Sequence, residues 1–115
     1  MTPTTAYKIL TASQMAALEA DGQFVGAPVD LADGYIHLST AAQLTETVDK
    51  HFAGQDDIHV AAVDLDALGD AVKWEESRGG QLFPHIYGAL PLAVVIAYGP
   101  LERDGDGAIK LPVAG

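Results

Sequence analysis

The spacing of apolar residues divides the chain into extended and helical segments. Residues 6–10, which are apolar or aromatic except for Lys8, predict a first strand. Thr11 and Gln14 follow at the three-residue spacing of a helix capping box, and they open a short helical pattern that ends at Gly22. The start of the chain therefore predicts a strand followed by a short helix.

A second capping-box pair, Thr40 with Gln43, predicts the start of another helix. Its apolar positions recur at helical spacing, and Gly54 is the expected stop. The apolar stripe consists of Leu44, Val48 and Phe52. We expect a helix of about eleven residues that packs this stripe against the core.

Most of the other apolar segments have the length and composition of strands. They fall at 35–38, 58–65, 72–75, 83–87, 92–98 and 109–111. An Asp-Gly-Asp-Gly sequence at 104–107 predicts a hairpin turn before the last of them. With two helices early and most strands late, the order predicts an α+β fold with a mixed, mainly antiparallel sheet. No repeat or linker interrupts residues 1–115, so we expect a single domain.

Charge and composition argue against several classes of function. Six basic residues stand against sixteen acidic ones, and the net charge of −10 disfavours nucleic acid held by its phosphates and anionic membrane surfaces. The absence of cysteine excludes disulfides, thiolate metal sites and cysteine nucleophiles. No segment has the pattern of a signal peptide or a membrane span, so we expect a cytoplasmic protein. Neither predicted helix has an apolar face beyond its core stripe, which predicts a monomer.

Two segments carry polar and aromatic residues that a core does not need. In the first, a strand would place Tyr35, His37 and Ser39 on one face and Ile36 with Leu38 on the other. The Ile/Leu face suits the core, so the polar face is a candidate cleft lining that could hydrogen-bond a sugar, an amide or a phosphate. The alternative is a half-exposed strand face without a ligand.

In the second segment, Glu75 and Arg78 precede a glycine pair, and Phe83, His85 and Tyr87 then alternate along a predicted strand. An arginine in a glycine-containing loop of an acidic protein is a candidate anion clamp. The alternative is that Glu75 and Arg78 form a surface ion pair while Phe83 and Tyr87 are core aromatics.

Read together, the two segments resemble those of a bacterial family of small, single-domain proteins of unknown function. The matching runs are Tyr-Lys-Ile-Leu at 7–10, Asp-Gly-Tyr-Ile-His-Leu-Ser at 33–39 and Phe-Pro-His-Ile-Tyr-Gly at 83–88, the last preceded by Lys-Trp-Glu at 73–75 and Ser-Arg-Gly-Gly at 77–80. The resemblance covers residues 6–101. It implies a fold similar to the ADP-ribosyltransferases, in which a split mixed sheet surrounds a central cleft.

The order of segments is also similar to that of the RNA 2′-phosphotransferases of the same superfamily, matched here at 36–39 and 62–64. Lys8 departs from that pattern, because it stands in the first strand where a cleft histidine is often found. The chain also lacks the additional arginines that an RNA phosphate would need, in agreement with its negative charge.

The resemblance implies a cleft enzyme of the ADP-ribosyltransferase type, or a relative that binds NAD or a similar nucleotide as substrate, with no other cofactor assigned. In such chemistry nicotinamide leaves, and a carboxylate stabilises the oxocarbenium-like ribose. The catalytic groups that we expect are Glu75, His37 and His85. Those expected to bind the nucleotide are Lys8, Tyr35, Ser39, Arg78, Phe83 and Tyr87, with Arg78 on the pyrophosphate and an aromatic ring stacked on the ligand.

Two other functions stay open. A non-catalytic ligand-binding or regulatory module would keep the cleft without turnover, and Lys8 favours this hypothesis. A metal-assisted hydrolase would use His37, His85 and Glu75 as ligands, although their spacing in the sequence does not predict a metal site.

Overall fold

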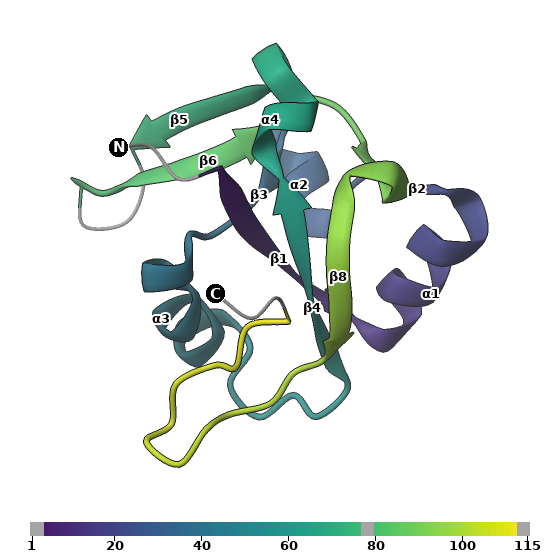
Figure 1. Ribbon diagram of the computed structural model, residues 1–115. Helices are drawn as coiled ribbons and strands as arrows, with labels where there is room; N and C mark the ends of the chain where they lie inside the picture. Colours follow the sequence, from purple (N-terminus) through teal and green to yellow (C-terminus); the bar gives the residue numbers. More distant parts are fainter. Residues whose placement is uncertain (1–3, 77–79, 113–115) are drawn as a thin grey trace.

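The computed structural model describes residues 4–76 and 80–112, and in this part of the chain the strands form three small sheets (Figure 1). The largest has the order β1 (Thr5–Thr11), β4 (Ile58–Asp64) and β8 (Val95–Pro100). The second has the order β3 (Ile36–His37), β6 (Leu82–Ile86) and β5 (Val72–Glu76). The third pairs β2 (Gln23–Phe24) with β7 (Leu90–Pro91). All these pairings are antiparallel, which confirms an α+β fold with antiparallel sheets.

The helices connect and cover these sheets. In the described chain they are α1 (Ala12–Asp21), α2 (Pro28–Asp33), α3 (Ala41–His51) and α4 (Leu65–Leu68), with 3-10 turns at Gly69–Ala71 and Leu92–Val94. Helix α1 begins as predicted, because the Gln14 N–H donates to Thr11 Oγ1 (3.2 Å) and the Thr11 N–H donates to Gln14 Oε1 (2.9 Å). It ends at Gly22 in the left-handed conformation (φ 75°).

Several predicted boundaries were wrong. Helix α3 has the eleven residues expected, but it ends at His51, short of the expected stop at Gly54, because Phe52 leaves the helical conformation (φ −127°) and packs against the core. The predicted strand at 92–98 begins only at Val95, since the residues before it form a 3-10 turn. The turn at 104–107 is present, but the strand expected after it is reduced to one bridge between Arg103 and Ile109.

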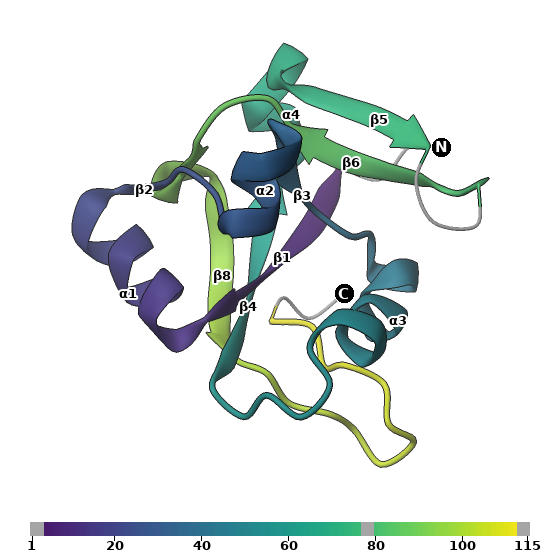
Figure 2. The same ribbon diagram turned by 180° about the vertical axis from the view of Figure 1, so that it is seen from behind.

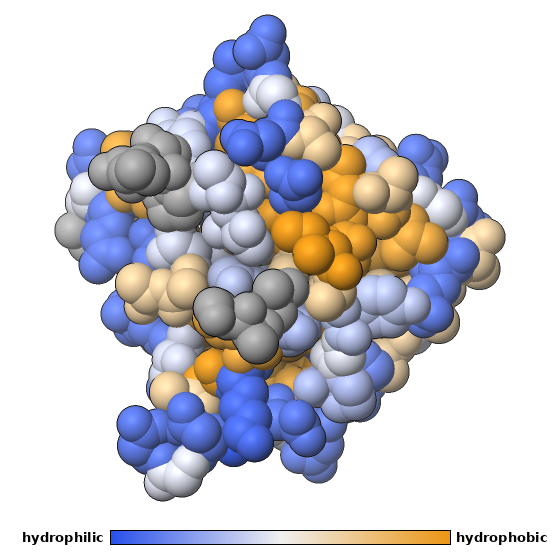
Figure 3. Space-filling model, in the orientation of Figure 1, coloured by the Kyte–Doolittle hydropathy of each residue, from blue (hydrophilic) through white to orange (hydrophobic). Residues whose placement is uncertain are grey.

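The three-stranded sheet β1-β4-β8 has a hydrophobic core on each face. Along β1, Ala6 and Leu10 join one core while Tyr7 and Ile9 join the other, as expected for alternating strand positions. Helix α1 covers the first core and α3 covers the second, and Figures 1 and 2 show these helices on opposite sides of the sheet. On the face drawn in Figure 3, an apolar area lies over β8, where Ile96 is exposed.

The segment 36–39 connects two of the sheets, because it pairs with a different sheet at each of its ends. Ile36 and His37 pair with β6, whereas Ser39 pairs with β1 through hydrogen bonds to Tyr7 (2.8 and 2.9 Å). The predicted strand 35–38 is therefore shorter, because the chain changes partner within it. As predicted, Ile36 and Leu38 are buried in the core. The sheets separate between β1 and β3, and this separation positions the site described next.

No helix among the described residues combines the length and the hydropathy that crossing a membrane requires.

Candidate functional site

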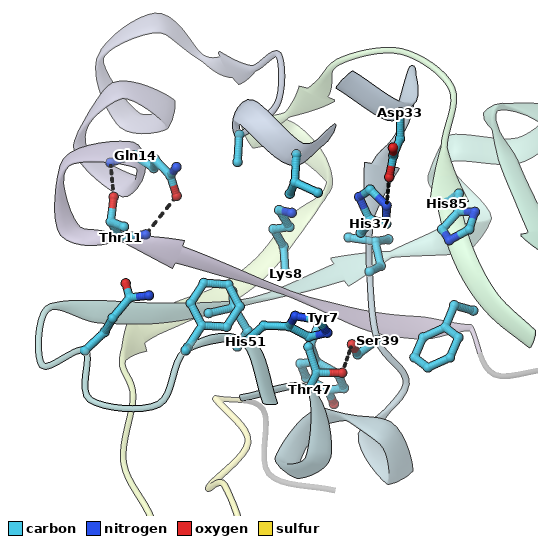
Figure 4. A pocket seen from close by; sticks show the side chains of 17 residues that line it. Tyr7, Lys8, Thr11, Gln14, Asp33, His37, Ser39, Thr47, His51 and His85 are labelled. Atoms are coloured by element: carbon cyan, nitrogen blue, oxygen red, sulfur yellow. Dashed lines mark hydrogen bonds and ion pairs between the residues drawn. The ribbon is translucent and has the colours of Figure 1, made fainter. Parts of the chain in front are cut away.

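A pocket of about 570 Å³ opens along β1, between α1, α2, α3 and the segment 36–39 (Figure 4). Its polar lining consists of Tyr7, Lys8, Thr11, Gln14, Asp33, His37, Ser39, Thr47, His51, Gln55 and His85. Its apolar lining consists of Ile9, Ala27, Val29, Leu38, Phe52 and Phe83. The volume lies within the range of about 300–1,000 Å³ that is usual for small-molecule sites.

The structure separates the predicted site residues into two groups. Those that line the pocket are Lys8, His37, Ser39, Phe83 and His85. Three others lie outside its lining. Tyr35 stacks on the ring of His85, Glu75 bonds that ring, and the Tyr87 hydroxyl bonds Glu75. Arg78 lies outside the described residues, so its assignment as an anion contact stays a prediction.

Lys8 enters the pocket as half of a buried ion pair. Its Nζ donates to both carboxylate oxygens of Asp30, at 3.0 and 3.2 Å, and both side chains are buried. Asp30 also accepts hydrogen bonds from the backbone N–H groups of Ala27 (2.8 Å) and His37 (3.1 Å). Lys8 therefore neutralises a carboxylate of the protein and offers little free charge to a phosphate.

The environment shifts the pKa of both partners. Burial alone would raise the pKa of Asp30, but the hydrogen bond from His37 and the charge of Lys8 outweigh it and hold this pKa well below its ordinary value. Burial lowers the pKa of the Lys8 ammonium, and Asp30 opposes this shift. We infer that the pair is ionised in the folded protein.

The low pKa of Asp30 predicts acid sensitivity. The folded carboxylate binds its proton less tightly than the unfolded one, so its stabilisation is complete above the unfolded pKa of about 3.9 and is lost as pH falls toward the lower folded pKa. Urea unfolding between pH 7 and pH 3 should show this loss, and Asp30→Asn should make the pH dependence shallower. Equal pH dependence in the two proteins would contradict the assignment.

His37 bridges two carboxylates of α2. Its Nδ1 lies 2.6 Å from Asp30 Oδ1, and its Nε2 lies 2.9 Å from Asp33 Oδ2. Two ionised carboxylates can both accept from one imidazole only when each ring nitrogen carries a hydrogen. The geometry therefore suits an imidazole that donates from both ring nitrogens.

His85 is held in a different way, by a carboxylate that does not line the pocket. Its Nδ1 lies 2.7 Å from Glu75 Oε1, and the Tyr87 hydroxyl donates to both oxygens of the same carboxylate (2.9 and 3.0 Å). The Tyr35 ring stacks on the His85 ring with a centroid distance of 4.1 Å. The hydrogen bonds from His85 and Tyr87 lower the pKa of Glu75, and Glu75 raises the pKa of Tyr87.

The second ring nitrogen of His85 is buried and has no hydrogen-bond partner within residues 4–76 and 80–112. The His85 side chain is only 2% exposed, and Glu75 on its Nδ1 side does not line the pocket. Because an ionised carboxylate fixes the hydrogen on Nδ1, Nε2 is left to accept a hydrogen bond or a proton. This is the carboxylate–histidine arrangement that general bases use.

The described residues give no support to the metal-assisted hydrolase. No three histidine, aspartate or glutamate side chains in that part of the chain are arranged to hold a metal ion. Glu75 already bonds Nδ1 of His85, and His37 is occupied by the two acids of α2.

The predicted site residues did not include Asp30, Asp33 or Thr47. Asp30 could have been sought as the partner of Lys8, because a lysine in a buried apolar strand needs a compensating charge. Thr47 shares a hydrogen bond with the predicted Ser39, between their hydroxyl oxygens at 2.9 Å. Its position on α3, at helical spacing among polar residues, gave no separate signal.

Comparisons with known proteins agree with the fold. Protein CC0527 from Caulobacter crescentus, in a crystal structure from a structural-genomics consortium, is 45% identical, with a TM-score of 0.84 over 93% of this chain and 94% of that chain. The solution NMR structure of the same protein gives a TM-score of 0.79 at 45% identity, over 93% of this chain and 91% of that one. Among curated proteins no match was found. A family model described as "Protein of unknown function (DUF952)" matches residues 9–98, and the chain belongs to this family.

Proposed function

We propose that this domain binds the ribosyl end of NAD, or of a similar nucleotide, in the pocket beside β1 and transfers the ribosyl group to an acceptor. The observation that carries the proposal is the buried His85, with Nδ1 on Glu75 and Nε2 unpartnered among the described residues at a pocket of suitable size. The proposal also rests on the resemblance of the motifs at 33–39 and 83–88 to a family with an ADP-ribosyltransferase-like fold.

The polar lining supports an uncharged ligand group inside the pocket. Hydroxyls of Ser39 and Thr47 and the amides of Gln14 and Gln55 suit a ribose or a carboxamide. Among the described residues, Lys8 is the only lysine or arginine in the pocket lining, and Asp30 neutralises its charge. We therefore expect the pyrophosphate to lie toward the rim rather than beside β1.

The proposed reaction assigns one role to each side of His85. The bond from the ribose to the nicotinamide nitrogen breaks, nicotinamide leaves with the electron pair, and an acceptor hydroxyl or water forms the new bond to the ribose. Nε2 of His85 takes the proton that the acceptor loses. Glu75 is then a positioning residue that acts through His85, in place of the direct contact with the ribose that we expected.

Isothermal titration calorimetry tests ligand binding directly. We expect both NAD and nicotinamide riboside to bind the wild-type protein. If Arg78 contacts the pyrophosphate, Arg78→Gln should weaken the binding of NAD about tenfold, because the phosphates lose a charge-assisted hydrogen bond. The binding of nicotinamide riboside, which has no phosphate, should stay unchanged. Arg103→Gln is the matched control, since Arg103 already pairs with Asp49 (2.8 Å).

Absence of binding for both compounds would contradict the proposal. Equal weakening of the two by Arg78→Gln would contradict the assignment of the pyrophosphate to Arg78. Binding of NAD without release of nicotinamide would favour the non-catalytic module, which the neutralised Lys8 also supports.

A further inference from the structure

Helix α2 forms one wall of the pocket, yet it has almost no apolar attachment to the rest of the protein. Asp30 is its buried residue, whereas Val29 is 58% and Leu31 62% exposed. Val29 and Asp33 line the large pocket on one side of the helix, and Leu31 lines a smaller one of about 180 Å³ on the other. A helix with hollows on both sides cannot be held by hydrophobic packing.

The attachment of α2 is polar. Asp30 bonds Lys8 of β1 and the ring and backbone of His37 in β3, and Asp33 bonds the other ring nitrogen of His37. Figure 4 shows the bond between Asp33 and His37 above the pocket, with Lys8 extending toward α2. His37 thus holds both acids of the helix at once, which requires charge on its ring.

We propose that the end of α2 at Asp33 is a lid over the pocket, which His37 holds closed and which opens when His37 loses its proton, while Asp30 stays anchored to Lys8. A neutral imidazole has one N–H and can donate to only one of the two carboxylates. The bond to Asp33, whose side chain is 45% exposed, would be lost before the short, buried bond to Asp30. The proposal rests on the proposed function only in that the pocket holds a ligand.

The other groups around His37 are consistent with a lid that is closed when both ring nitrogens of His37 carry a hydrogen. From α2 it faces the anionic Asp30 and Asp33, and Lys8 of β1 reaches it only through Asp30. The Tyr35 ring, at 4.8 Å, and the His85 ring of β6, at 5.3 Å, also lie beside it, and Glu75 of β5 accepts the hydrogen bond of His85 Nδ1. The doubly bonded arrangement needs a hydrogen on each ring nitrogen, so the lid should close as the pH falls.

Amide hydrogen exchange measured by NMR on the ligand-free protein tests the lid. The informative amides are those of Gly34 and Tyr35, which donate to the Asp30 carbonyl, and of Leu31, which donates to the Ala27 carbonyl. After correction for intrinsic rates, we expect their protection to fall about tenfold or more from pH 6 to pH 8. Protection of Val60 in β4 should stay constant and report that the fold is intact.

Two variants separate the lid from a general effect of pH. Asp33→Ala should expose the α2 amides at pH 6 as much as wild type at pH 8, and His37→Gln should remove the pH dependence. The matched control is Asp66→Ala, which removes an exposed acid from the short helix α4. Protection of α2 that is independent of pH in the wild type, or unchanged in Asp33→Ala, would overturn the proposal. Neither result depends on whether NAD binds.

Discussion

Asp30→Ala is expected to lower the free energy of unfolding by about 3–5 kcal/mol, the largest stability change that the structure predicts for one side chain outside the apolar core. The substitution leaves the Lys8 ammonium buried without its counter-charge, and it removes an acceptor from Ala27 and His37. Urea unfolding at pH 7 measures the loss. The exposed Asp66→Ala should stay within about 0.5 kcal/mol of wild type.

A second substitution distinguishes the buried charge from the other contacts of Asp30. Lys8→Met removes the charge, so in the Asp30→Ala background it should restore part of the lost stability, even though it destabilises the wild-type protein. If Asp30→Ala resembles Asp66→Ala, or if Lys8→Met makes it less stable still, the ion pair does not have the role that its burial indicates. Asp30→Asn is the milder variant should Asp30→Ala fail to fold.

The parts of the fold that could be predicted are those with a local signal. Two capping boxes marked the starts of α1 and α3, and alternation at 36–38 placed Ile36 and Leu38 in the core. The same alternation found His37 and Ser39 in the pocket lining. In each case the side chains needed were neighbours in sequence, so the pattern was enough.

Helix α2 could not be predicted because it is held by charges from distant strands. Its six residues present no apolar stripe, and Asp30 is explained only by Lys8, which lies 22 positions away in sequence. Pro28 at its start and Gly34 at its end are ordinary helix signals, but they do not predict a helix without an apolar stripe between them.

The position of Glu75 also depended on information that the sequence lacks. In the observed register, Lys73 pairs with His85 and Glu75 pairs with Phe83, so Glu75 and His85 are diagonal neighbours on adjacent strands. The carboxylate therefore reaches Nδ1 of His85 before it could reach a ligand in the pocket. A predicted catalytic acid became a residue that orients a histidine, because register decides which side chains meet.

His85→Gln is expected to slow the release of nicotinamide from NAD by about 100- to 10,000-fold, the usual contribution of a general acid–base group. Glutamine approximates the size of the imidazole and can still bond Glu75, so NAD affinity should change less than tenfold. Glu75→Gln should cause a smaller loss, because Glu75 acts only through the tautomer of His85 and does not line the pocket.

The most direct measurement compares nicotinamide release by wild type, Glu75→Gln and His85→Gln at saturating NAD, with calorimetry to confirm that each variant still binds. The buried, unpartnered Nε2 of His85 predicts release by wild type, reduced release by Glu75→Gln and almost none by His85→Gln. Release by His85→Gln at the wild-type rate would contradict the central assignment, as would wild-type protein that binds NAD and never releases nicotinamide.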